Sequence, residues 1–587
     1  MFPRIILFVL VCASAHASNF AKLQAPWLEI LPPGIYESKP APRGALKIPF
    51  SNTPKGKPIR ANPNECSALE LKNEMAVASK DARGQAQTIQ NFMNRCDEVL
   101  RPFSEDRILA ILRLAEGNYP LAGRDNLREI VLHLPYKTKV HGLLAIKDTD
   151  RPRPMVIMIC GSGCNLSDSA ARFFLTQTFD TMPFNVLILP SLSGSDFIKD
   201  NRGFGLGGFE EGRQTFEVVR LLGELDSPFR NIITSFHIVG TSLGGNGALF
   251  TAAYGSFNNQ YLVGPKINSV IGYCPVVDLK ASLMDLDRDD PTGKYFTGLI
   301  SETILKNFAY VFGSSADMPT LYKPGKKQSV PFLEKYIYPR YKVLSQINEF
   351  QLAPMTQADL DTPETFWNAN NFLNYFSKIT VPTLLLYSQD DFIVSPKLNS
   401  QALQSALDQS PNPLVNVVGV EKGSHCAASE IYGDDIIDGA LENFILSQSP
   451  EFDYASGARD LELSQLKGFK NIELNLDEKF FGYDLEAKKG STSAELTLKI
   501  WNPHHTDGSL RCSEWEPFHA YEGCFRQAYL QLPLKSFFPF IDGKVSSKEN
   551  AQSLTRWLNR RVHLETKTGL EPVNTTAFPS VAKWTID

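Results

Sequence analysis

FHIVGTSLGGNGALF, residues 236–250, decides the fold of this chain. Its first four residues are mostly apolar, which is typical of a short buried strand, and a helical pattern follows Ser242. The serine therefore lies at a sharp turn from strand to helix. Gly240 and Gly244 stand two residues before and after it, where they remove the Cβ atoms that would clash in such a turn. The spacing predicts a nucleophile elbow with Ser242 at a helix N-terminus, whose dipole favours a developing negative charge.

Strand patterns alternate with helix patterns on both sides of this elbow. A hairpin is predicted over 128–134 and 140–146, around the turn Pro135-Tyr136-Lys137. Five further apolar runs follow, at 155–160, 185–189, 270–274, 383–387 and 414–420. Short apolar strands that alternate with helices predict an α/β fold, in which a mostly parallel sheet carries helices on both faces.

An acid and a base follow the serine, close behind two later strands. Asp390 and Asp391 follow one predicted strand, and His425 follows the next. Parallel sheets hold their sites at the carboxyl ends of strands, and a serine hydroxyl needs a base to take its proton. We therefore expect Ser242 as nucleophile, His425 as base and Asp391 as acid. Asp391 is preferred because a D-x-x-V-x-P turn begins there, and Asp390 remains the alternative.

Two backbone N–H groups are expected to bind the oxyanion that forms when a serine attacks a carbonyl group. One belongs to Leu243, the residue after the nucleophile. The other is expected from Ser162, in the glycine-rich loop Gly161-Ser162-Gly163 behind an earlier strand. A tight turn that needs glycine only for its backbone angles is the alternative for this loop.

Two further motifs bear on cofactors. The stretch GFGLGG, residues 203–208, does not follow a strand directly, and no acidic residue closes a βαβ unit of the right size. It predicts a loop that leads into a helix rather than a dinucleotide site. Cys160 and Cys164 are separated by three residues and lack a matching second pair, so we expect no metal there. Neither a metal nor an organic cofactor is expected.

The elbow and the segments of Asp391 and His425 resemble the YheT-like branch of the α/β-hydrolase superfamily, over about residues 125–447. That family has a G-x-S-L-G-G-N elbow, which matches residues 240–246 here, and an acid in D-D-P-x-x-P. The stretch 366–382 is similar to the family's short helical segment before the penultimate strand. The resemblance implies the α/β-hydrolase fold and an esterase or lipase-like activity on small-molecule or lipid acyl esters.

The chain departs from this family at three positions. Cys160 stands where the family has its loop histidine, Phe392 stands where it has proline, and Pro396 falls one residue late. Two other functions stay open beside an ester hydrolase that works through an acyl-enzyme intermediate. One is a serine peptidase or amidase with the same triad, and the other is a non-catalytic envelope-binding protein on the same fold.

The first 17 residues have the layout of a secretory signal peptide. Arg4 supplies a positive charge, an apolar run covers 5–11, and Ala15-His16-Ala17 fits an A-x-A cleavage site. The run is shorter than the roughly 20 apolar residues that span a bilayer, and no later stretch approaches that length. We therefore expect an exported protein, periplasmic or secreted, with no transmembrane segment after cleavage. A formal net charge of only -5 without a basic stripe predicts no nucleic-acid partner.

The 587 residues exceed what one hydrophobic core usually serves, so several units are expected. Residues 18–125 predict a partly helical extension, and residues 126–449 predict the hydrolase domain. The insertion at about 278–380 is too long for a simple loop and predicts a cap over the site. Residues 455–587 predict a β-rich domain, which is a candidate for contact with the cell envelope or a polymer.

Export also bears on the cysteines. Removing the signal peptide leaves eight of the nine, and disulfides form in oxidising compartments. Cys66 with Cys96 and Cys512 with Cys524 are candidate bridges, because each pair is close along the chain. The sequence leaves the connectivity open.

Overall fold

The computed structural model describes the central part of the chain almost continuously. The described residues are 20, 121 and 124, the ranges 23–32, 66–100, 126–147, 152–288, 329–344 and 352–449, and seven strands after residue 471. The predicted signal peptide at 1–17 and the candidate bridge Cys512–Cys524 lie outside the described residues.

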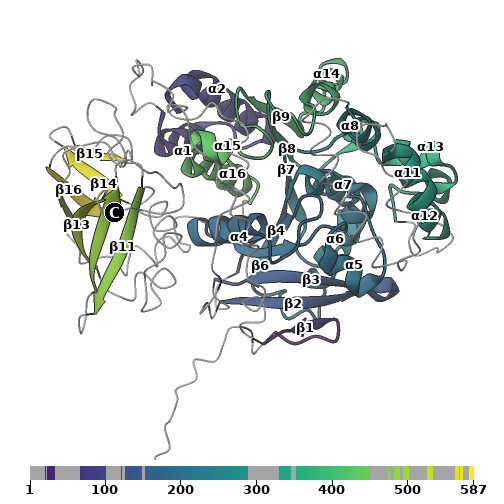
Figure 1. The fold of residues 1–587 in the computed structure, drawn as a ribbon, viewed down its shortest axis with the longest axis horizontal. Helices are drawn as coiled ribbons and strands as arrows, with labels where there is room; N and C mark the ends of the chain where they lie inside the picture. Colours follow the sequence, from purple (N-terminus) through teal and green to yellow (C-terminus); the bar gives the residue numbers. More distant parts are fainter. Residues whose placement is uncertain are drawn as a thin grey trace, which may run out of the picture.

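A nine-stranded sheet forms the centre of the described chain (Figure 1). Its strands are β1 (Leu28–Ile30), β2 (Leu127–Leu134), β3 (Thr138–Ala145), β4 (Arg153–Ile159), β5 (Asn185–Leu189), β6 (Ile233–Thr241), β7 (Ile267–Tyr273), β8 (Thr383–Ser388) and β9 (Val415–Val420). Their spatial order is β1-β2-β3-β5-β4-β6-β7-β8-β9. The pairs from β1 to β5 are antiparallel, and all pairs from β5 to β9 are parallel.

The sheet buries side chains on both faces because successive residues of its strands are apolar. Along β4, Met155, Ile157 and Ile159 pack into one hydrophobic core. Val156 and Met158, which point to the opposite face, pack into the other. All five side chains are at most 5% exposed. The uninterrupted apolar runs in the sequence thus correspond to strands that are covered on both sides.

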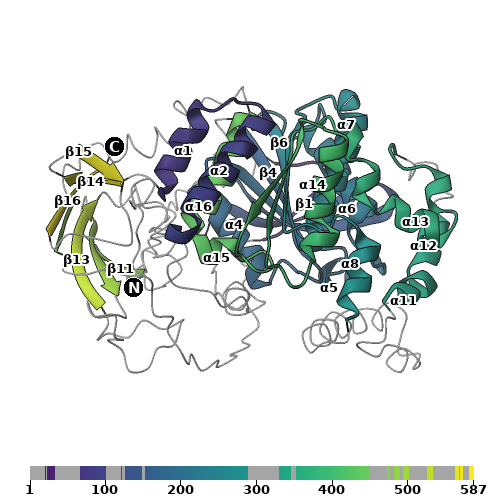
Figure 2. The ribbon, with the colours of Figure 1, turned by 90° about the horizontal axis from the view of Figure 1, so that it is seen from above.

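Helices form the layers over these two faces (Figure 2). One core is completed by α1 (Ala68–Val77), α2 (Ala82–Leu100), α4 (Ser169–Thr181), α15 (Ala428–Tyr432) and α16 (Asp434–Ser447). The other is completed by α5 (Ser195–Asn201), α6 (Gly208–Gly223), α7 (Ser242–Asn258), α8 (Leu279–Leu286) and α14 (Ser400–Gln409). Helix α2 buries Ile89, Phe92, Met93 and Cys96, which recur at helical spacing.

This strand order, with an antiparallel hairpin strand beside a parallel remainder, is that of the α/β-hydrolase fold. The predicted fold class is therefore confirmed. The run predicted at 185–189 coincides with β5, and the hairpin turns through a short 3-10 helix, η4 (Pro135–Lys137). The edge strand β1 was not predicted, because three residues within a Pro-rich region give no periodic pattern.

The insertion between β7 and β8 is helical in its described part. It holds α8, α11 (Ser329–Tyr336), α12 (Tyr338–Leu344), α13 (Pro363–Ala369) and the 3-10 helices η7 (Gln357–Leu360), η8 (Phe372–Asn374) and η9 (Phe376–Lys378). The ring of Phe366 lies 4.9 Å from that of Tyr341 and 6.0 Å from that of Phe209, measured between centroids. These ring contacts pack α12 and α13 against α6. A covering function over the site remains a prediction.

The seven strands after residue 471 pair into two antiparallel sheets. They are β10 (Ile472–Asn475), β11 (Gly482–Lys489), β12 (Ala494–Trp501), β13 (Phe525–Leu532), β14 (Val562–Thr566), β15 (Gly569–Pro572) and β16 (Val581–Ile586). One sheet has the order β10-β16-β14-β15 and the other β11-β12-β13. Apolar residues alternate with polar ones along β12, at Leu496, Leu498 and Ile500. Whether this region is a separate domain remains a prediction.

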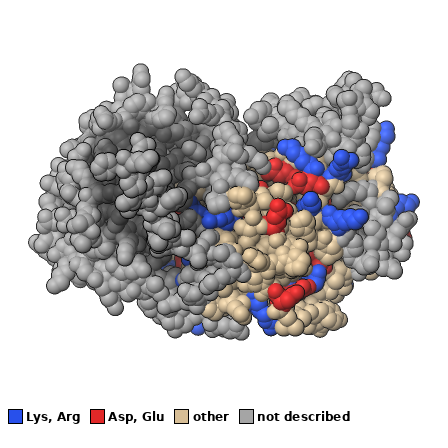
Figure 3. All heavy atoms as spheres, turned by 90° about the horizontal axis from the view of Figure 1, so that it is seen from below, with Lys and Arg blue, Asp and Glu red and all other residues tan. Residues whose placement is uncertain are grey.

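None of the helices among the described residues is both long and apolar enough to cross a bilayer. On the described part of the face in Figure 3, acidic and basic side chains are interspersed with other residues. That part of the face therefore gives no sign of an electrostatic docking surface.

Candidate active site

Ser242 begins helix α7 directly after strand β6, and its backbone has a left-handed φ of 54°. A non-glycine residue rarely adopts this conformation, which persists where the surroundings hold it. A Cβ atom on Gly240 would lie 2.1 Å from the carbonyl oxygen of Gly244. One on Gly244 would lie 2.4 Å from the carbonyl oxygen of Cys160. Both positions exclude a side chain, which is the steric reason for the glycine spacing.

His425 links Ser242 to Asp391. Its Nε2 atom lies 2.8 Å from the hydroxyl oxygen of Ser242, and its Nδ1 atom lies 2.8 Å from a carboxylate oxygen of Asp391. Since a carboxylate only accepts hydrogen bonds, Nδ1 donates to Asp391, and Nε2 of the neutral ring accepts from the serine hydroxyl. The imidazole can therefore take the serine proton while the carboxylate holds the ring.

The two acids that the sequence left open have different partners. The second carboxylate oxygen of Asp391 accepts the N–H groups of Ile393 and Val394, both at 2.9 Å. These bonds fix the turn after β8, and the Asp391 side chain is only 3% exposed. Asp390 instead accepts the backbone N–H of Ser424 at 2.9 Å. Asp391 thus holds the His425 ring, and Asp390 holds the backbone one residue before it.

The glycine-rich loop after β4 passes beside the serine. A Cβ atom on Gly161 would lie 3.3 Å from the Cβ atom of Ser242. The N–H of Gly163 donates to the hydroxyl of Ser193 at 2.8 Å, so this group is engaged with the segment that follows β5. Ser162 lies between the two glycines and is exposed. The structure therefore places Ser162 next to the residue that contacts Ser242.

Leu243 follows Ser242 in the first turn of α7. The first N–H groups of a helix have no intrahelical partner, so the Leu243 N–H can donate to a bound group. Its buried side chain packs against Gly207, where an added Cβ atom would lie 2.9 Å from the leucine. Gly207 has a left-handed φ of 64°. The GFGLGG stretch therefore lets the start of α6 approach the start of α7 closely.

A buried glutamate, Glu211, lies at the contact between α6 and α7. Glu211 in the first turn of α6 accepts the N–H of Leu192 at 3.3 Å. A Cβ atom on Gly247 of α7 would lie 2.6 Å from a Glu211 carboxylate oxygen, so the acid packs against α7. Burial raises the pKa of Glu211 to about 8. Sequence patterns missed this residue, because a glutamate in a first helical turn is usually exposed.

Three disulfides are present among the described residues. Cys66–Cys96, one of the two candidate pairs, is present. Cys160–Cys164 and Cys274–Cys426 were not expected. The first of these closes the loop that contains Ser162, and the second involves the residue after His425. The short C-x-x-x-C spacing could have indicated the loop bridge, whereas Cys274 and Cys426 are 152 positions apart in the sequence.

Comparison with known proteins identifies no close relative. No protein-family model and no curated protein matches the chain. Among solved structures, the Pyrococcus furiosus esterase Pf2001 has 14% identity and a TM-score of 0.31, covering 55% of this chain and 91% of its own. The 2,6-dihydroxy-pseudo-oxynicotine hydrolase has 15% identity and a TM-score of 0.33, covering 65% and 78%. The Pyrococcus horikoshii acylaminoacyl peptidase has 10% identity and a TM-score of 0.32, and the match covers 57% of this chain and 44% of that protein.

The strand order and the elbow between β6 and α7 define the fold of the central part of the chain. On those grounds the central part of this chain has the α/β-hydrolase fold.

Proposed function

We propose that this chain is an exported serine hydrolase that cleaves acyl esters. One observation carries the proposal: two contacts of 2.8 Å connect Ser242 through His425 to Asp391, behind the carboxyl ends of β6, β9 and β8. A serine hydroxyl is a weak nucleophile until a positioned base takes its proton, and the base in turn needs an orienting group. All three groups stand in that order here.

The geometry supports the following sequence of steps. Oγ of Ser242 attacks the ester carbonyl carbon while Nε2 of His425 takes the hydroxyl proton. The carbonyl oxygen becomes an oxyanion, which the N–H groups of Leu243 and Ser162 would stabilise. The bond to the leaving oxygen then breaks, His425 protonates the alcohol, and the acyl group stays on Ser242. A water molecule then attacks the acyl carbon as His425 takes a proton from it, the acid leaves, and His425 returns that proton to the Oγ atom of Ser242. Asp391 stabilises the imidazolium in both halves.

The proposal also includes a preference for esters over amides. An alcohol leaves more easily than an amine, so an ester makes the smaller demand on His425 as a general acid. The resemblance to the YheT-like branch supports acyl esters, and we place the chain in that branch as part of the same proposal. The substrate class is then a small-molecule or lipid ester, and no cofactor takes part.

Export is supported by the signal-peptide pattern at the N-terminus and by the cysteines. Six cysteines of the described residues form three disulfides, the state expected in an oxidising compartment. We therefore propose a periplasmic or secreted location. The β-rich region after residue 471 would contact the cell envelope or a polymer, and its failure to bind either would count against that role.

Hydrolysis of matched substrates tests the proposal. The mature protein is compared with Ser242→Ala and Ser405→Ala, since Ser405 is an exposed serine of α14 that serves as the matched control. Wild type and Ser405→Ala should hydrolyse p-nitrophenyl butyrate, and Ser242→Ala should lose on the order of 10⁴-fold or more in kcat. Equal cleavage of butyryl p-nitroanilide would indicate an amidase. A folded protein that cleaves neither substrate would favour the envelope-binding alternative.

A further inference from the structure

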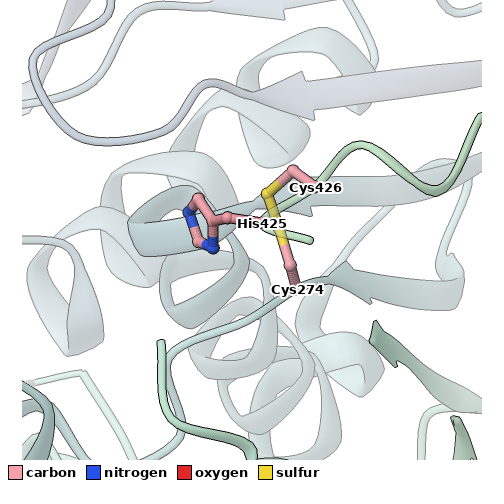
Figure 4. Close-up of side chains that lie close together, drawn as sticks. All are labelled: Cys274, His425 and Cys426. Carbon is pink, nitrogen blue, oxygen red and sulfur yellow. A yellow bond between two sulfur atoms is a disulfide. The ribbon is translucent and has the colours of Figure 1, made fainter. Parts of the chain in front are cut away.

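The Cys274–Cys426 disulfide joins the segment after β7 to the loop that carries His425. Cys426 directly follows His425, and Cys274 directly follows the last residue of β7 (Figure 4). Their Cα atoms lie 5.3 Å apart. Both cysteines are buried, at 2% and 6% exposure. The bridge is therefore a covalent link in the interior, one residue from the imidazole that contacts Ser242.

The backbone at both ends of this bridge is in a conformation that L residues rarely adopt. The φ angles are 56° at Cys426 and 48° at Cys274, and Ser424 on the other side of the histidine has a φ of 50°. Left-handed conformations in non-glycine residues persist only where the surroundings fix them. His425 thus lies between two such residues, and its placement depends on whatever holds this loop.

The Cys274 end of the bridge belongs to a segment that contacts the nucleophile. The N–H of Cys274 donates to the carbonyl oxygen of Leu386 in β8 at 2.7 Å. Two residues on, the N–H of Val276 donates to the carbonyl oxygen of Ser242 at 3.2 Å. Pro275 packs against Gly245, where an added Cβ atom would lie 2.8 Å from the Cβ atom of the proline. The disulfide therefore connects the loop of the base to the segment that contacts the nucleophile.

Hydrogen bonds also hold the histidine loop. Asp390 accepts the Ser424 N–H at 2.9 Å, and the hydroxyl of Tyr432 accepts the Lys422 N–H at 2.9 Å. Each can be exchanged for a bond with water if the loop moves. Among the described residues, the bridge to Cys274 is the covalent cross-link between this loop and the segment after β7.

The same side chains could be mistaken for a metal site. One ligand atom from each of Cys274, His425 and Cys426 lies within 4.8 Å of the other two. The two sulfur atoms are bonded to each other, however, and both ring nitrogens of His425 have partners in Ser242 and Asp391. The cluster is therefore explained by the disulfide and the catalytic contacts together.

We propose that the Cys274–Cys426 disulfide positions His425 for proton transfer from Ser242. This inference rests on the proposed serine hydrolase function and adds two positioning residues to it. The bridge fixes the left-handed backbone around His425 relative to the elbow. At that position, Nε2 of His425 lies within hydrogen-bond distance of the Ser242 hydroxyl. Without it the loop relaxes, and the imidazole leaves the line between Asp391 and Ser242.

Removal of the bridge tests this role against removal of another bridge. Cys274→Ser/Cys426→Ser is compared with Cys66→Ser/Cys96→Ser, since Cys66 and Cys96 are bonded to each other and neither adjoins a triad residue in sequence. The readouts are kcat and KM for p-nitrophenyl butyrate and the rate of labelling by a fluorophosphonate, each per folded molecule. A displacement of about 1 Å at a reacting group can cost about 100-fold in rate.

We expect kcat and the labelling rate of Cys274→Ser/Cys426→Ser to fall about 10- to 100-fold with KM nearly unchanged. The Cys66→Ser/Cys96→Ser protein should keep both rates within about threefold of wild type, although it unfolds more easily. A purely structural bridge would lower the folded fraction without this division between kcat and KM. Wild-type rates in the folded Cys274→Ser/Cys426→Ser protein would overturn the inference.

Two further outcomes distinguish a folding defect from a failure of the proposed hydrolase function. If the serine pair does not fold, Cys274→Ala/Cys426→Ala keeps the buried positions apolar and is measured in the same way. Failure of both pairs to fold would show that the bridge serves the whole fold, which overturns a positioning role. If folded wild type neither labels nor hydrolyses, the proposed hydrolase function fails, whereas a labelled wild type with an equally labelled variant rejects only the role of the disulfide.

Discussion

The carboxylate of Asp390 accepts the backbone N–H of Ser424 at 2.9 Å, one residue before the histidine whose ring contacts Asp391. Adjacent acids at the end of β8 therefore hold the base at two points. One point is the imidazole ring, and the other is the backbone of its loop. This division of contacts makes the two acids separable by experiment.

Replacement of each acid by its amide should have unequal effects. Asp391→Asn can donate to the ring and favours the wrong tautomer of His425, so kcat should fall on the order of 10⁴-fold. Asp390→Asn keeps an oxygen that accepts the Ser424 N–H, so its kcat should fall less than about tenfold. Steady-state hydrolysis of p-nitrophenyl butyrate measures both. Equal losses, or the larger loss for Asp390→Asn, would reverse the assignment.

The elbow glycines predict a contrast in stability. Gly244→Ala places a methyl group where a Cβ atom would lie 2.4 Å from the Cys160 carbonyl oxygen, and the backbone must move. We expect a loss of about 3 kcal/mol or more in the free energy of unfolding. Gly439→Ala in α16 meets nothing within 4 Å. It should gain about 0.5–1 kcal/mol, because alanine is the better helix former. Urea unfolding measures both, and similar changes would refute the steric account.

The buried carboxyl of Glu211 predicts a pH dependence of stability. Burial raises its pKa from 4.5 to about 8. Between these values the unfolded chain binds fewer protons than the folded one, so the free energy of unfolding falls as pH rises. Glu211→Gln removes the ionisation. Relative to this variant, wild type should lose up to about 5 kcal/mol between about pH 4.5 and about pH 8. Parallel stability curves, measured by urea unfolding at several pH values, would contradict it.

His141 predicts a second pH effect, at the junction of β3 and α5. Its ring nitrogens lie 2.9 Å from Glu129 and 2.8 Å from Asp200. The hydrogen bond to Glu129, aided by the charge of Asp200, raises the pKa of His141 above 6.5. This stabilisation is fully present below pH 6.5 and is lost as pH rises through the folded pKa. His141→Gln should therefore destabilise the protein more at about pH 6 than at about pH 9. Thermal unfolding at both values measures this, and a pH-independent effect would exclude it.

Local patterns account for the part of the site that the sequence predicted. The spacing of Gly240, Ser242 and Gly244 has a steric cause within a few residues of chain, so it is visible in one short motif. The parallel strands are visible for a similar reason, since burial on both faces requires consecutive apolar residues. Asp391 and His425 follow from the rule that sites gather at the carboxyl ends of such strands.

The missed features depend on contacts between distant segments. Cys274 and Cys426 are 152 residues apart and meet because β7, β8 and β9 are neighbours in the sheet. Glu211 is buried where glycines such as Gly207 and Gly247 let α6 and α7 approach closely. No periodicity or motif in either segment contains this information. It appears once the sheet and its helices are assembled.

The central claim is that Ser242 is activated by His425, and covalent labelling tests it most directly. The mature protein is treated with a fluorophosphonate, digested, and mapped by mass spectrometry, beside His425→Ala and the control Ser405→Ala. The account predicts one label, on Ser242, at equal rates in wild type and Ser405→Ala and at least about 10³-fold more slowly in His425→Ala. A label on another serine, or an equal rate in His425→Ala, would contradict it.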